Sequence, residues 1–129
     1  MADRMRYTDL IVWQRGMDLV VRAYTLSQDL PAHERFGLVA QIRRAAVSVP
    51  ANVAEGHGRL HRGDYIHHLS IASGSLCELQ TLALASARLG YVADRVVGDF
   101  VECTNDLGRM LSALIRRLRH AHPLSPIPS

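Results

Sequence analysis

Apolar residues recur at steps of three and four along most of this chain, in four long stretches joined by short turns. The stretches cover about residues 9–28, from 32–35 to 56–58, from 62–64 to 89, and 93–119. This spacing keeps side chains on one face of an α-helix, whereas a strand requires alternation at a step of two. Stretches of about 27 residues form helices of about 40 Å, and matched helices with short connections stack antiparallel. The pattern predicts an all-α fold, an up-down-up-down antiparallel four-helix bundle.

Each predicted helix has an apolar stripe that should face the core. In the first it comprises Leu10, Trp13, Met17, Val20 or Val21, and Tyr24, and in the second Phe36, Val39, Ile42, Ala46, Val49 and Val53. In the third it comprises Tyr65, Leu69, Ala72, Leu76, Leu79, Ala83 and Leu84. In the fourth it comprises Val96, Phe100, Cys103, Leu107, Met110 or Leu111, Leu114 and Leu118. The small residues at 70–75 are expected to pack closely against the alanine-rich part of the second helix.

Prolines and glycines mark where the predicted helices end or bend. Pro31 should end the first helix, because the residue before a proline is pushed out of the helical conformation. Pro50 interrupts the second helix, yet the apolar stripe keeps its phase across it, so we expect a kink and not a break. Gly90 is expected to cap the third helix. The chain thus divides into an N-terminal extension (1–8), the bundle (9–120) and a disordered, proline-rich tail (121–129).

Composition limits the class of protein. A chain of 129 residues forms one domain, and its 15 basic residues, all arginine, exceed its 12 acidic ones by a net charge of +3. This excess permits phosphate contacts without requiring them. No apolar run approaches the roughly 20 residues of a membrane span, and Cys77 and Cys103 lack metal-binding spacing. We therefore expect a cytoplasmic protein without membrane contact, with both cysteines reduced in the core.

A polar stripe bounded by alanines follows one face of the second helix. It consists of Arg44, Ser48, Asn52, Glu55 and Arg59, at steps of four, four, three and four. One interpretation is that Ser48, Asn52 and Glu55 are partly buried against the third helix, at Ser73, Ser75 or Glu78, and fix the register of the bundle or an interface.

The other interpretation is a basic surface for nucleic acid. Arg43, Arg44, Arg59 and Arg62 are the candidate phosphate contacts. No aromatic residues are interleaved with them as a platform for stacked bases, so such binding should depend on shape and backbone. The arginines at 116, 117 and 119 are expected to form an ordinary solvated helix end.

Other chemistry has weak support. Histidines gather between the second and third helices, where Asp64 and His68 could share a face, but His67 and His68 point about 100° apart. We therefore predict no metal site and no cofactor. The sequence lacks a G-x-S-x-G elbow, a P-loop and an H-E-x-x-H motif. We expect no enzymatic activity.

Five sequence stretches carry a family resemblance. They are LIVWQ at 10–14, ERFGL at 34–38, QIRRAA at 41–46, SVPANVAEG at 48–56 and IASGSLCEL at 71–79. Together they resemble the four-helix-bundle family of proteins encoded in intervening sequences of bacterial 23S ribosomal RNA genes. The resemblance implies a ring of identical subunits, a pentamer. It also implies kinship with the accessory protein of diversity-generating retroelements, a basic bundle that binds nucleic acid and a reverse transcriptase.

Two functions follow as hypotheses. The first is a non-enzymatic, homo-oligomeric bundle that binds structured RNA, ribosomal RNA among the candidates, or other nucleic acid through arginine-rich faces. The alternative is a protein-interaction scaffold without nucleic-acid binding, in which the same residues serve assembly alone.

Overall fold

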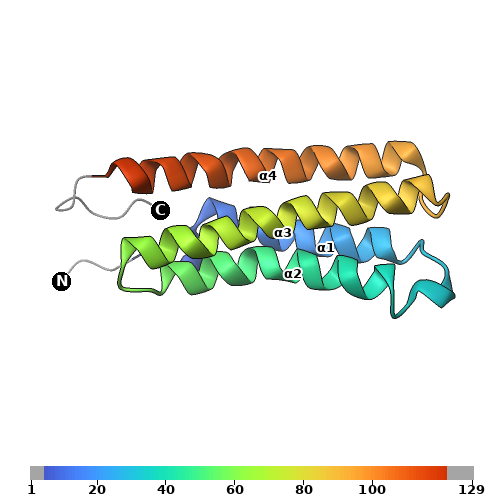
Figure 1. Ribbon diagram of the computed structural model, residues 1–129, viewed down its shortest axis with the longest axis horizontal. Helices are drawn as coiled ribbons and strands as arrows, with labels where there is room; N and C mark the ends of the chain where they lie inside the picture. Colours follow the sequence, from blue (N-terminus) through green and yellow to red (C-terminus); the bar gives the residue numbers. More distant parts are fainter. Residues whose placement is uncertain (1–4, 122–129) are drawn as a thin grey trace.

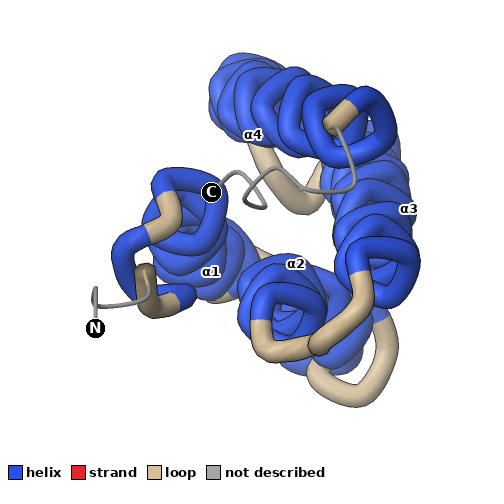
Figure 2. Tube along the Cα trace, turned by 90° about the vertical axis from the view of Figure 1, so that its left-hand side faces the viewer, coloured by secondary structure: helices blue, strands red, loops and turns tan. Residues whose placement is uncertain are grey.

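The computed structural model describes residues 5–121. In this range the chain contains four α-helices and no strand. The α-helices are α1 (Ile11–Ser27), α2 (Leu38–His57), α3 (Arg62–Arg88) and α4 (Asp94–His120), and the 3-10 helices η1 (Tyr7–Asp9) and η2 (Ala32–Glu34) precede α1 and α2. Successive α-helices run in opposite directions (Figure 1) and surround a common centre (Figure 2). The predicted up-down-up-down bundle is confirmed. Residues 1–4 of the predicted extension and 122–129 of the predicted tail lie outside the described range.

The predicted cap of α3 is present at Gly90. This residue has φ of +78°, a left-handed conformation that glycine adopts without steric cost. Its amide donates to the Ala87 carbonyl, and the Tyr91 amide donates to the Ser86 carbonyl at 3.0 Å. These two bonds complete a Schellman motif, which turns the chain sharply into α4.

Two helix starts differ from the prediction. The chain at Thr8 and Asp9 forms η1, so α1 begins later, at Ile11. The second helix begins at Leu38 and not near 32–35, because Gly37 leaves the helical conformation. The amide of Leu38, the first residue of α2, donates to the Glu34 carboxylate at 3.3 Å. Glu34 also accepts a hydrogen bond from the Tyr91 hydroxyl, so it ties this helix start to the turn before α4.

The core lies between all four helices and is built from aliphatic residues. The predicted stripes of α2 and α3 are largely confirmed, with Ile42, Val49, Leu69 and Leu79 fully buried. In α4, Leu111 and not Met110 points inward. No helix among residues 5–121 has both the length and the apolar run needed to cross a membrane.

The predicted stripe of α1 is confirmed at Leu10 but is wrong by part of a turn further along the helix. The buried positions are Val12, Gly16, Leu19, Ala23 and Leu26, with Ser27 beside them. Met17, Val21 and Tyr24, which the prediction placed in or beside the core, are 42%, 66% and 39% exposed. The small residues Gly16 and Ala23 carry no strong hydrophobic signal, so the larger neighbouring residues determined the predicted phase.

Other predicted core residues are also exposed. Phe36 is 87% exposed because it lies in the connection before α2, and Leu84 and Val96 are partly exposed on their helices. Both cysteines are free as predicted, but neither is a core residue. Cys77 is exposed on α3 and Cys103 is half-buried on α4.

Close contacts between α1, α2 and α3 depend on two glycines. A methyl group on Gly16 of α1 would lie 3.2 Å from Cβ of Pro50 on α2. A methyl group on Gly56 of α2 would lie 2.7 Å from Cβ of His68 on α3. The second helix runs through Pro50 without a break, as predicted, while the kink itself stays a prediction. Gly16 and Gly56 thus allow the helix backbones to approach closely.

Candidate nucleic-acid interface

A chain of hydrogen bonds connects α2 to α3 through the middle of the predicted polar stripe. The hydroxyls of Ser48 and Ser75 lie 2.8 Å apart. The Asn52 amide nitrogen donates to the Ser48 carbonyl at 2.8 Å, and the Asn52 side-chain oxygen lies 3.1 Å from Nδ1 of His68. All four side chains are buried or half-buried. Such a polar contact favours one register of α2 against α3, because a shift would leave buried polar groups unpaired.

Glu55 is separate from this network although it belongs to the same predicted stripe. Its carboxylate accepts a hydrogen bond from Arg59, one turn later, at 2.6 Å. The two side chains are 55% and 47% exposed, so the ion pair contributes little stability. Glu55 therefore points toward solvent, where it partly neutralises Arg59.

The four predicted phosphate contacts do not form one surface. Arg43 lies near the start of α2, where its guanidinium stacks 4.6 Å from the centre of the Tyr24 ring and donates to the Ser27 hydroxyl at 3.0 Å. It thus holds α2 against α1. Arg44 beside it is exposed. At 1.5 Å per residue, about 20 Å of helix separates this pair from Arg59 and Arg62, at the turn between α2 and α3.

Arg59 and Arg62 have other arginines as neighbours. The α2–α3 turn and the end of α4 lie at the same end of the bundle (Figure 1). Arg62 donates to the Ala121 carbonyl at 3.4 Å, which ties the start of α3 to the end of α4. We call the surface formed by Arg59, Arg62, Arg116, Arg117 and Arg119 the basic end. The arginines of α4, expected to form an ordinary solvated helix end, thus lie at the same end of the bundle as two of the predicted phosphate contacts.

A buried tyrosine lies beneath the basic end. Tyr65 is 2% exposed, and its hydroxyl has no hydrogen-bond partner among residues 5–121. Burial raises the pKa of Tyr65 to about 12, and the nearby Arg117 guanidinium lowers this pKa in part. The His57 ring packs edge-on against Tyr65, with 5.7 Å between ring centres. Within the described residues, no three side chains of His, Cys, Asp or Glu lie close enough together to hold a metal ion.

A groove follows the seam between α3 and α4, and the sequence pattern did not predict it. Two cavities of about 410 and 550 Å³ adjoin there, because Ser73, Ser112 and Arg116 line both. We call this the α3–α4 groove. Its arginines are Arg109, Arg116 and Arg119, and none of the residues that line it in the described part of the chain is acidic. The small residues at 70–75 do not all pack against α2 as predicted, because Ser73 faces this groove.

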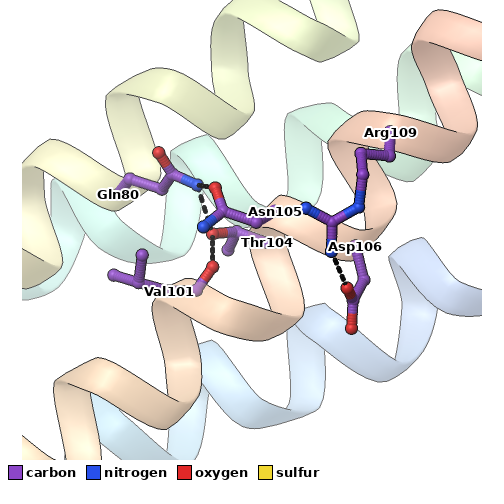
Figure 3. Close-up of polar contacts among 6 residues, drawn as sticks. All are labelled: Gln80, Val101, Thr104, Asn105, Asp106 and Arg109. Carbon is purple, nitrogen blue, oxygen red and sulfur yellow. Dashed lines mark hydrogen bonds and ion pairs between the residues drawn. The ribbon is translucent and has the colours of Figure 1, made fainter.

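Part of the groove wall is held in place by a cluster of side chains shown in Figure 3. The Gln80 amide nitrogen on α3 donates to the Thr104 hydroxyl and to the Asn105 side-chain oxygen on α4, each at 2.6 Å. Thr104 in turn donates to the Val101 carbonyl at 2.7 Å. Arg109 pairs with Asp106, one turn before it on α4 (Figure 3). The 3–4–3 spacing of positions 70, 73, 77 and 80 was the sequence signal for this face.

A smaller cavity of about 130 Å³ lies between α1 and α4. Arg15, Asp18 and Arg22 of α1 line it together with Cys103 and Asp106 of α4. The Arg22 guanidinium donates to the Cys103 sulfur, which is half-buried there. Opposite charges alternate around this cavity, so it has no strong preference for an anion.

An apolar face lies on the outer side of the seam between α1 and α2. Met17, Val21 and Tyr24 follow one another on α1 at steps of four and three, so they share one face. Val47 on α2 is 43% exposed and lies one turn after Arg43. The Arg43 guanidinium in turn packs over the Tyr24 ring. We call these four residues the α1–α2 apolar face. Exposed apolar patches of this kind often mark interfaces between proteins.

Comparison with known proteins agrees with the architecture. A crystal structure of a protein of unknown function from the S23 ribosomal protein family of Bacteroides thetaiotaomicron has a TM-score of 0.76 with this chain at 22% sequence identity. The match covers 82% of this chain and 99% of that one, and shows that the two share a fold. Comparison with curated proteins gives no significant match. Residues 8–113 match the family described as 23S rRNA-intervening sequence protein, and the chain therefore belongs to that family.

Proposed function

We propose that this protein is a non-enzymatic, cytoplasmic, homo-oligomeric bundle that binds structured RNA, or nucleic acid more broadly, through its basic end. The observation that carries the proposal is the gathering of five arginines from the α2–α3 turn and from α4 at one end of the bundle. Guanidinium groups bind phosphate oxygens in pairs, so this residue type suits a phosphate backbone.

The charge balance at this end favours an anionic partner. Glu55 pairs with Arg59, and Asp64 lies in the first turn of α3, where it complements the helix dipole. Arg116 and Arg119 make no ion pair with any of residues 5–121. Their exposed guanidinium groups can therefore approach phosphates without first giving up a carboxylate.

Recognition is expected to follow RNA shape and not base sequence. Sequence-specific RNA binding commonly stacks unpaired bases on exposed aromatic rings. On the α2–α3 turn and the last turns of α4, Tyr65 is buried and the ring beside it belongs to His57, which leaves arginine as the main contact from these elements. Backbone contacts by arginine position a protein on nucleic acid without reading bases.

The α1–α2 apolar face supports self-association. Solvent-exposed helix faces usually carry polar or charged side chains, whereas these four are apolar or aromatic. Contact with a second copy would remove them from water. The family resemblance favours a closed ring of five subunits. In such a ring each subunit contacts its neighbours through two different patches.

A scaffold without nucleic-acid binding remains the second candidate, because Arg43 and the Ser48–Asn52 network already have structural partners. The two candidates differ in how binding to 23S ribosomal RNA fragments depends on salt. The test compares the double variant Arg59→Gln/Arg119→Gln with the matched control Arg88→Gln/Arg95→Gln, which removes the same charge from exposed positions at the other end of the bundle.

We expect measurable RNA binding at low salt, with a logarithmic salt slope that falls by roughly 0.7–0.9 for each phosphate contact removed by the first variant. The control variant should bind as the unmodified protein does. Absence of RNA binding at low salt, or equal losses in the two variants, would refute the basic end as the nucleic-acid surface. Light scattering in the same buffer tests the assembly, and a monomer at micromolar concentration would refute it.

A further inference from the structure

We infer that the α3–α4 groove holds an unpaired strand of RNA, such as a loop or an end, by its sugar–phosphate backbone. This inference rests on the proposed function and extends it from the basic end onto the side of the bundle. Arg116 lines both cavities of the groove, and Arg119 lies where the groove meets the basic end. A strand held at the basic end could therefore continue along the groove.

The charge of the groove calls for an anionic occupant. Among residues 5–121, three arginines and His120 line it, and no carboxylate does. Arg109 alone has an ion-pair partner, Asp106, and both members of that pair are more than 60% exposed. Exposed pairs of this kind contribute little, so a phosphate can replace the carboxylate without a large loss.

The remaining lining groups suit ribose. Between the arginines the walls present Ser70, Ser73 and Ser112, followed by the Gln80–Thr104–Asn105 cluster. The Ser73 hydroxyl is buried and has no hydrogen-bond partner among residues 5–121. Hydroxyl and amide groups both donate and accept, as does the ribose 2′-hydroxyl. Contacts to that group are what allow a protein to distinguish RNA from DNA.

The same lining argues against a second copy of this chain as the occupant. Stable interfaces between subunits have an apolar centre, whereas interfaces with nucleic acid are more polar and more basic. The apolar residues of the groove are few, and Ile115 among them is buried. The α1–α2 apolar face, with four exposed apolar residues, fits contact with a second copy better than this groove does.

Two glycines of α4 allow a matched test. Gly108 lines the groove, and a methyl group there would lie 3.9 Å from Leu76, an ordinary contact. Gly98, on the same helix, has no atom within 4 Å of an added methyl group. Gly108→Gln should fill the groove, while Gly98→Gln makes the same change outside it. Both exchanges favour the helix, so both variants should fold.

The experiment measures binding of one unstructured sequence, as RNA and as DNA, to the unmodified protein and its variants, with light scattering on each protein. We expect Gly108→Gln to weaken RNA binding by about tenfold or more and Gly98→Gln to leave it unchanged. Ser73→Ala/Ser112→Ala should weaken RNA binding by roughly three- to tenfold and leave DNA binding unchanged.

Equal RNA affinities of the two glutamine variants would overturn the groove as the binding track, although RNA binding by the unmodified protein would still support the basic end. A Gly108→Gln variant that changes the oligomeric state without changing RNA affinity would assign the groove to subunit contact. Equal binding of RNA and DNA by the unmodified protein would overturn the role of the 2′-hydroxyl. Failure of the unmodified protein to bind the unstructured strand in either form would overturn the groove as the binding track, and the proposed function itself would be refuted only if the protein also failed to bind the 23S ribosomal RNA fragments at low salt.

Discussion

Gly56→Ala adds a single methyl group at the closest approach of α2 and α3. The new carbon would lie 2.7 Å from Cβ of His68 and 3.1–3.2 Å from the ring and carbonyl of Tyr65. Neither the His68 Cβ nor the Tyr65 carbonyl can rotate away, so the helices must separate. Overpacking of this kind costs about 1–3 kcal/mol, while alanine gains up to about 1 kcal/mol over glycine in a helix. The net loss should be about 1–2 kcal/mol.

Thermal unfolding followed by circular dichroism measures this loss, which corresponds to a decrease in Tm of roughly 4–10 °C. Protein concentration must be the same for all samples, because an oligomer has a concentration-dependent Tm. Gly98→Ala is the matched control, since its methyl group meets no atom within 4 Å, and it should raise Tm. If Gly56→Ala were as stable as Gly98→Ala, the proposed close approach of α2 and α3 would be wrong.

Three further predictions concern buried or half-buried polar groups. Tyr65→Phe should not destabilise the protein at pH 7, because the lost hydroxyl has no partner among residues 5–121, as urea unfolding would show. Burial raises the pKa of Tyr65 from about 10 in the unfolded chain to about 12 in the folded protein, so its neutral form contributes fully to the free energy of unfolding below pH ~10. This contribution is lost as the pH rises toward ~12, and the variant should lack this loss. Arg43→Gln should cost about 1–2 kcal/mol through loss of the ring contact and the Ser27 bond, whereas Arg44→Gln should change stability by less than about 0.5 kcal/mol. Ser48→Ala should cost about 1 kcal/mol of unfolding free energy, and adding Ser75→Ala should cost little more, because the two hydroxyls bond to each other. A double-mutant cycle measures this coupling.

The fold could be predicted because its main determinants are local. Helical periodicity, Pro31 and Gly90 specify where helices form and end, and short connections between long helices leave an antiparallel bundle as the simple solution. The phase of α1 could not be found in this way. Its core face contains Gly16 and Ala23, and these positions are buried because other helices approach them closely, which depends on tertiary structure.

The candidate site was predicted less well, because it combines residues far apart in sequence. Arg59 and Arg62 stay predicted phosphate contacts, whereas Arg43 has structural contacts that no single helix reveals. The basic end requires the end of α4 to return beside the α2–α3 turn. The α3–α4 groove likewise exists only once two helices meet, so the spacing of positions 70, 73, 77 and 80 on α3 could not reveal that Ser112 of α4 lies opposite.

The contact between Gly16 and Pro50 restricts how α1 can slide along α2. A shift of one helical turn, about 5.4 Å, would bring Val12 or Leu19 over the proline ring in place of the glycine. Neither side chain fits where a methyl group already comes within 3.2 Å of Cβ. The contact between Gly16 and Pro50 thus excludes the neighbouring registers of α1 against α2, including registers that would keep the apolar residues of α1 in the core. Exchange of Gly16 for a larger residue should therefore be harmful in a way that a smaller residue at position 50 could relieve.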